Sequence, residues 1–139
     1  MFQKVQLIGH LGKDPVMRYA PSGDPVTSFS MATSEKWNGQ DGQLHEKTTW
    51  WSISVWGKRA ESVNAHLHKG SKVFVEGKMQ PDDKGNPRTW AAQDGSTRAS
   101  FEVKASLVQF LDSKPTGSNG STSHSAEAVP AEEEDGIPF

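Results

Sequence analysis

The sequence predicts an all-β fold, a small five-stranded Greek-key barrel with one short helix between its third and fourth strands. Three observations support this prediction. Short segments of alternating apolar and polar residues recur along residues 1–111, and turn-forming residues separate them. One segment in mid-chain, residues 58–70, has apolar residues at helical spacing. After Leu111 the large apolar residues become scarce, and we expect a disordered C-terminal tail there.

Alternation locates the strands, and Pro, Gly and Asp locate the turns. Residues 14–25 and 81–97 are rich in these turn formers and are expected to be loops, and residues 38–43 (NGQDGQ) the tip of a long hairpin. The five expected strands cover residues 4–12, 26–35, 47–57, 72–80 and 98–111.

The helix is predicted from its apolar stripe. Ala60, Val63 and Leu67 fall on one side of a helix, and Gly70 can cap its end. Three strands, a helix and then two strands are the order of the OB-fold, a partly open Greek-key barrel. A generic antiparallel sandwich is the alternative, and the single mid-chain helix favours the barrel.

Charge and composition divide the chain into three parts. Residues 1–111 hold 14 Lys and Arg against 11 Asp and Glu, a net charge of +3, and are expected to form the folded domain. Residues 112–139 hold one Lys against six Asp and Glu, a net charge of −5. Residues 112–131 read as a Ser-, Gly- and Pro-containing linker, and residues 132–139 as a separate acidic peptide.

Two absences in the sequence narrow the protein class. The chain has no cysteine, so it has neither disulfides nor a thiolate zinc site. It also has no apolar run long enough for a signal peptide or a membrane span. We therefore expect a soluble cytoplasmic protein.

The segment TTWWSISVWG, residues 48–57, contains three of the five tryptophans. Side chains alternate between the two faces of a strand, so Trp51, Ile53 and Val55 share one face, which we expect to line the core. Trp50 and Trp56 then share the other face with Ser52 and Ser54. Two large apolar rings on a face with serines are expected to be exposed.

Other aromatic residues also have polar neighbours. Trp37 follows the second strand at the base of a loop, Trp90 lies in the loop before the fifth strand, and Phe74 alternates with charged side chains. One interpretation is that this surface packs against another copy of the protein or under a loop. The favoured interpretation is a platform on which unpaired nucleobases stack, because every base has a π face. In a duplex those faces are already stacked, so the platform predicts a preference for single strands.

Basic residues lie close in sequence to these aromatics and are candidates for contacts to phosphates. They are Lys36, Lys47, Lys58, Arg59, Lys72, Lys78, Arg88 and Arg98.

In these aromatic and basic residues and in the segments around them, the chain resembles the bacterial-type single-stranded DNA-binding proteins over essentially its whole length. The matching segments are KVQLIGHLGKDPVMRY, VTSFSMATSEKW, TTWWSISVWGKRAE, HKGSKVFVEGKM and the terminal GIPF. The resemblance implies an OB-fold that forms a homotetramer and wraps single-stranded DNA. It also implies that Trp37, Trp50, Trp56 and Trp90 occupy base-stacking positions.

The chain departs from that family in its PDDKGNPR loop, at Gly136 where an acidic residue is usual, and at two adjacent positions of the third strand. Trp51 stands where relatives often have a histidine that lies near a subunit interface. Ser52 stands where some relatives carry a basic residue, so one phosphate contact is expected to be missing.

The C-terminal peptide EEEDGIPF has the features of a recognition motif. Ile137 and Phe139 are apolar anchors, and Pro138 between them restricts their conformations. The free carboxylate of Phe139 suits a basic pocket. The acidic residues would steer the peptide to basic partners, which the resemblance identifies as replication, recombination and repair proteins. Its residues are Glu132, Glu133, Glu134, Asp135, Gly136, Ile137, Pro138 and Phe139.

The opposite charges of the two parts suggest a second role for the acidic tail. Residues 112–139 could compete with DNA for the basic domain, an effect that salt would weaken.

An enzyme is the main rival interpretation. The segment GHLGKD lacks the spacing of a phosphate-binding loop, and the histidines show no metal-binding pattern, so we expect no enzymatic activity, metal or cofactor. The second rival is a single-stranded RNA-binding module of the same fold, because stacking alone does not distinguish the two sugars.

Overall fold

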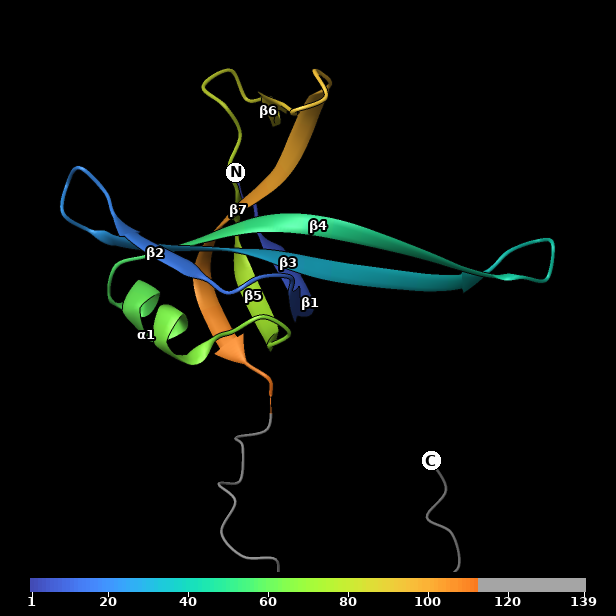
Figure 1. Cartoon of the computed structure of the whole chain (residues 1–139), viewed down its shortest axis with the longest axis horizontal. Coiled ribbons are helices and arrows are strands. Elements are labelled where there is room, and N and C mark those ends of the chain that lie inside the picture. Colours follow the sequence, from blue (N-terminus) through green and yellow to red (C-terminus); the bar gives the residue numbers. More distant parts are fainter. Residues whose placement is uncertain (113–139) are drawn as a thin grey trace, which may run out of the picture.

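The computed structural model describes residues 1–112 of the chain (Figure 1). The expected linker over residues 112–131, apart from its first residue, and the acidic peptide over residues 132–139 lie outside the described residues. The elements are β1 (Val5–Leu11), β2 (Val16–Tyr19), β3 (Pro25–Asn38), β4 (Leu44–Trp56), α1 (Lys58–His66), β5 (Lys72–Met79), β6 (Arg88–Ala91) and β7 (Thr97–Phe110).

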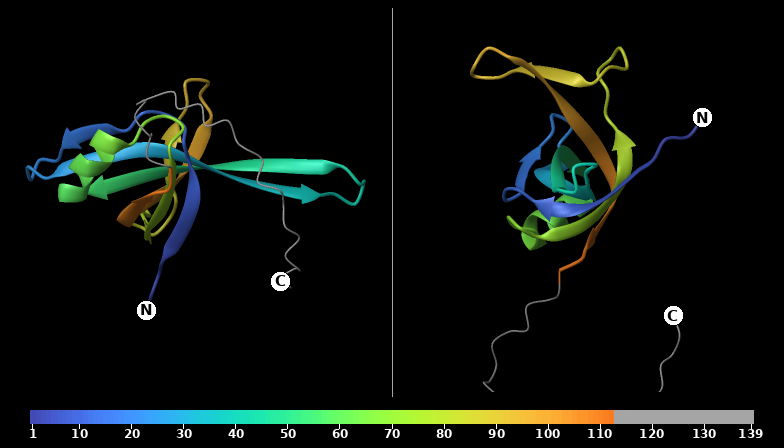
Figure 2. Two further views of the ribbon diagram at one scale, coloured as in Figure 1. Left: turned by 90° about the horizontal axis from the view of Figure 1, so that it is seen from below. Right: turned by 90° about the vertical axis from the view of Figure 1, so that its right-hand side faces the viewer.

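Five of the strands form a closed barrel in the order β1-β5-β7-β4-β3, and pairing between β1 and β3 closes it. The neighbours are antiparallel except β4 and β7, which run parallel. Helix α1 lies between β4 and β5, at one end of the barrel (Figures 1 and 2). The predicted OB-fold, with its helix between the third and fourth barrel strands, is therefore confirmed.

Two short strands were not predicted. Strand β2 lies within residues 14–25 and pairs with the start of β3, and β6 lies within residues 81–97 and pairs with the start of β7. The expectation that these segments are loops throughout was wrong. Proline and glycine mark the turns around each strand, but the four residues between the turns can still pair with a neighbouring strand.

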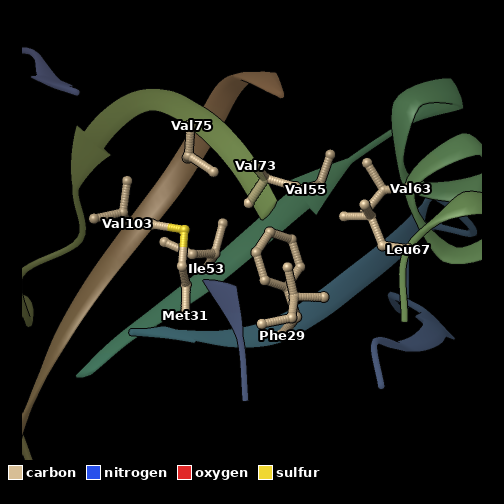
Figure 3. Packing of buried hydrophobic residues seen from close by; sticks show 10 residues of the cluster. Phe29, Met31, Ile53, Val55, Val63, Leu67, Val73, Val75 and Val103 are labelled. Carbon is tan, nitrogen blue, oxygen red and sulfur yellow. The ribbon is translucent and has the colours of Figure 1, made fainter. Parts of the chain in front are cut away.

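The core fills the inside of the barrel with alternate residues of its strands (Figure 3). Each fully buried Val, Ile or Met side chain contributes roughly 1.5–3 kcal/mol to stability. Helix α1 closes one end, where Thr27 Oγ1 donates a 2.6 Å hydrogen bond to the carbonyl oxygen of Ala60. The core cluster contains Leu11, Phe29, Met31, Ile53, Val55, Val63, Leu67, Val73, Val75 and Val103.

Strands β3 and β4 continue past the barrel as a long two-stranded hairpin (Figure 1). Thirteen residue pairs join the two strands, and the turn between them falls in residues 39–43, as predicted. The hairpin therefore carries side chains away from the barrel.

No helix within residues 1–112 is long and apolar enough to cross a membrane.

Candidate nucleic-acid interface

The predicted alternation along β4 is confirmed. Trp50 and Trp56 point outward, with 56% and 41% of their surface exposed, whereas Ile53 and Val55 are buried. Between the two tryptophans, Ser52 and Ser54 pair with serines of β3. These small side chains do not cover the indole rings.

Trp51 faces inward and is half-buried against the core. Its indole Nε1 donates a 2.9 Å hydrogen bond to Thr33 Oγ1, and its ring centroid lies 5.3 Å from that of Phe101. The neighbouring tryptophans of β4 thus have different environments, one structural and one open to solvent.

Trp90 lies on strand β6, whereas the sequence predicted that it lies in a loop. It pairs with Arg98 of β7, and alternation along β7 continues through Ser100 to Glu102, which pairs with Ser52 of β4. Trp90 therefore shares the outward face of β4 with Trp50 and Trp56. A groove of about 230 Å³ is lined in part by Trp50, Trp90 and Arg98.

We call this outward surface of β4, β7 and β6, with Trp50, Trp56 and Trp90, the tryptophan face. The Trp90 ring is held in place because its Nε1 donates a 3.0 Å hydrogen bond to Ser100 Oγ. The ring remains 51% exposed. Three large flat apolar surfaces are therefore open on one side of the barrel.

Trp37 is separate from this group. It lies within β3, near the far end of the hairpin, whereas the sequence predicted it just after the second strand, at the base of a loop. Alternation from Met31 places it on the opposite face of the two-stranded ribbon from Trp50. Its ring stacks on the imidazole of His45, with centroids 5.7 Å apart and planes 21° from parallel.

A carboxylate fixes the turn beside Trp37. Asp41 Oδ1 accepts a 3.0 Å hydrogen bond from the backbone N–H of Gln43 and lies 3.2 Å from His45 Nε2. These two contacts lower the pKa of Asp41, the backbone bond having the larger effect. Trp37 is thus presented on an ordered hairpin end.

Phe74 is half-buried on the outside of β5. In register with it are Ile8 of β1 and Gln109 of β7, and β7 separates β5 from β4. The structure does not bring Phe74 to the tryptophan face.

The predicted basic residues are scattered, and several are paired. Arg98 lies 6.0 Å from the Trp90 ring centroid and 3.4 Å from Asp94, while Arg88 pairs with Glu102 at 3.5 Å. On the hairpin, Lys36 is 4.0 Å from Glu46, and Lys47 stands opposite Glu35.

The remaining predicted basic residues occupy three places. Lys58 and Arg59 open α1 directly after Trp56, because Gly57 turns the chain there with a φ of 75°. Lys72 lies on the outer side of β5 next to a groove between β1 and the hairpin. Lys78, further along β5, stands opposite Lys104 of β7.

Sequence reasoning missed Lys104. Its Nζ lies 4.9 Å from the centroid of the Trp56 ring. A signal was available, because Lys104 alternates with the buried Val103 and must point outward. Its position relative to Trp56 depends on the parallel register of β4 and β7.

Within residues 1–112, no three His, Cys, Asp or Glu side chains are arranged to hold a metal ion.

Comparison with known proteins places this geometry in a family. Proteins called single-stranded DNA-binding protein from two strains of Neisseria meningitidis are each 39% identical over 117 residues, covering 84% of this chain. The match spans 64% of the length of these relatives. "Single-stranded DNA-binding protein 1" of Xylella fastidiosa is 36% identical over 98% of this chain and 96% of its own length.

Solved structures agree with the sequence comparison. A Plasmodium falciparum SSB in complex with ssDNA is 29% identical, has a TM-score of 0.66, and covers 81% of this chain and 97% of that one. A deletion mutant of the single-stranded DNA binding protein from Thermus aquaticus is also 29% identical, with a TM-score of 0.63, and covers 80% and 51%. The model of the Single-strand binding protein family matches residues 2–111. The chain therefore belongs to the Single-strand binding protein family.

Proposed function

We propose that this protein binds single-stranded DNA without sequence preference and protects it during replication, recombination and repair. The observation that carries the proposal is the tryptophan face, with three exposed indoles beside cationic side chains. Membership of the family supports it, as does the similarity to a protein solved in complex with ssDNA.

In this proposal the bases stack on the indoles of Trp50, Trp56 and Trp90. Each stacked base contributes about 1–3 kcal/mol, largely regardless of its identity. Trp37 adds a stacking site at the end of the β3–β4 hairpin, which single-stranded DNA would reach by continuing around that hairpin. Phe74 lies on β5, which β7 separates from β4, and we assign it a peripheral contact on the outside of β5.

Phosphate contacts would come from the basic residues near these rings. Arg98 is best placed, because it lines the groove between Trp50 and Trp90. Lys58 and Arg59 follow Trp56, Lys36 and Lys47 flank Trp37 along the hairpin, and Lys72, Lys78 and Arg88 extend the basic surface over β5 and β6. The binding constant falls as the salt concentration rises, and each neutralised phosphate of the single strand makes that fall steeper.

The rest of the proposal concerns assembly of the domain and the role of the C-terminal segment. The domain of residues 1–111 assembles into a homotetramer, and residues 112–131 link it to the acidic peptide 132–139. That peptide recruits replication, recombination and repair proteins through Ile137, Pro138 and Phe139. The protein acts by binding, in the bacterial cytoplasm in association with the nucleoid, and not as an enzyme.

Tryptophan fluorescence during titration with poly(dT) tests the central claim. Bases stacked on the indoles should quench the emission strongly, and duplex DNA of equal length should quench it little. Competition with poly(U) tells DNA from RNA, and a preference for poly(U) would replace the proposal with a single-stranded RNA-binding module. Absence of quenching by either polymer would overturn base stacking.

A further inference from the structure

We propose that Lys78 and Lys104 together form a phosphate-binding subsite beside Trp56, so that one nucleotide has its base on the Trp56 ring and its phosphate between the two lysines. The inference rests on the proposed function, and its ligand is the phosphodiester of single-stranded DNA.

The two lysines are direct neighbours on adjacent strands. Lys78 of β5 and Lys104 of β7 are register partners, and both side chains point out of the barrel. Like charges directly opposite each other on one face of a sheet destabilise it. The free protein thus holds two ammonium groups in an unfavourable arrangement that a bound anion would relieve.

The nearest carboxylates on the same face do not neutralise the pair. Glu76, two residues before Lys78, accepts Lys4 Nζ at 2.6 Å and Gln6 Nε2 at 2.8 Å. The bonds from Lys4 and Gln6 lower the pKa of Glu76, so this carboxylate is charged and already engaged.

The carboxylate on the other strand is engaged as well. Glu102, two residues before Lys104, is 3.5 Å from Arg88. Within the described part of the chain, neither Lys78 nor Lys104 forms an ion pair. Both ammonium groups therefore remain available to a ligand.

The site adjoins a base-stacking surface and a hollow. Ser54 of β4 pairs with Lys104, so Trp56 lies diagonally across from that lysine, whose Nζ is 4.9 Å from the ring centroid. On the other side, both lysines line a groove of about 420 Å³ that also includes Lys4, Gln80 and Ser106. Single-stranded DNA that continues past Trp56 would meet cations and polar side chains along this groove, so the groove could hold the next phosphates of its backbone.

Salt dependence of binding to poly(dT) tests the subsite. For single strands, the slope of log K against log salt changes by about 0.7 for each phosphate contact. Because the two lysines share one phosphate, we expect the double variant Lys78→Gln/Lys104→Gln to lower the slope by about 0.7, and each single variant by part of that amount. The control Lys69→Gln removes one positive charge in the turn after α1 and should leave the slope nearly unchanged.

A stability measurement excludes a merely structural role for Lys78. Removing one of two facing like charges should leave the thermal unfolding temperature of Lys78→Gln unchanged or raised, while its DNA affinity falls.

The outcomes separate the two proposals. Wild-type protein that does not bind poly(dT) would overturn the proposed function. Wild-type protein that binds, with slopes of Lys78→Gln and Lys104→Gln unchanged or lowered no more than that of Lys69→Gln, would overturn the subsite alone.

Discussion

The two faces of β4 place the same residue type in different environments. Trp51 faces the core, donates a hydrogen bond to Thr33 and packs against Phe101, whereas Trp50, its immediate neighbour, is 56% exposed and has serines and an alanine near it. Burial of Trp51 stabilises the barrel. Exposure of Trp50 leaves more than half of its surface open to a ligand. The face that a tryptophan occupies, and not the residue type, therefore determines whether it packs against the core or is open to a ligand.

The largest expected effect is on the core side of this comparison. Trp51→Ala should lower the free energy of unfolding by about 3 kcal/mol, the lower end for buried aromatics because the ring is half-buried. Urea denaturation followed by circular dichroism measures it, with Trp50→Ala as the matched control. Equal destabilisation by the two variants would contradict the distinction between the faces.

On the exposed side, Trp50→Ala should weaken binding to poly(dT) by about 1–3 kcal/mol, because one stacking surface is lost. Its unfolding temperature should stay close to that of the wild-type protein. Trp50→Phe should retain most of the affinity, since a smaller π face remains. Binding by Trp50→Ala that matches the wild type would remove this residue from the interface.

A smaller effect should follow from moving the Trp50 ring without removing it. A Cβ at Gly12 would contact the six-membered ring of Trp50, so Gly12→Ala must displace that ring. Displacing the ring from its preferred rotamer costs about 0.5–1.5 kcal/mol, and we expect a loss of affinity of that size. In a Trp50→Ala background the substitution should have no further effect, and an additive loss would show that Gly12 acts independently of the ring.

The smallest effect concerns pH. Hydrogen bonds from Lys4 and Gln6 lower the pKa of Glu76 below its ordinary value of 4.5. A lowered carboxyl pKa stabilises the folded state above the unfolded pKa, and that contribution disappears as the pH falls through the folded value. Thermal unfolding below about pH 4.5 should therefore show a slightly shallower loss of stability for Glu76→Gln than for the wild type. Parallel pH profiles would show that the ion pair contributes nothing.

The assignment of faces in β4 could be predicted from the sequence because alternation with period 2 depends only on the strand itself. The OB-fold followed from the order of elements and the single helix. Neither conclusion needed a contact between distant segments.

What the sequence did not reveal depends on such contacts. Trp90 joins the tryptophan face because β6 pairs with β7 and β7 lies parallel to β4. Lys104 lies against Trp56 for the same reason. In β7 the register with β5 shifts between Ala105 and Leu107, so alternation read through the whole strand assigns its second half to the wrong face.

Phe74 and Trp37 show a further limit. Polar neighbours correctly predict that each side chain is at least partly exposed, but not which side of the molecule it occupies. Phe74 lies on β5, with β7 between it and β4, and Trp37 lies on the opposite face of the hairpin from Trp50. The local sequence predicts whether a side chain is exposed. Which exposed side chains lie on the same surface depends on how the strands pair in the fold.

The parallel pairing of β4 with β7 also has a consequence for folding kinetics. The β3–β4 hairpin joins residues as few as six positions apart, Asn38 with Leu44, whereas the parallel pair joins Trp51 with Phe101 across 50 positions. Contacts between distant positions form slowly, because a long loop must close before they give any stabilisation. We therefore expect the hairpin to form early and the β4–β7 pair late. We thus expect β7, which brings Trp90 beside Trp50, to pair with β4 after the hairpin has formed, so a chain with the hairpin alone would not yet have a complete tryptophan face.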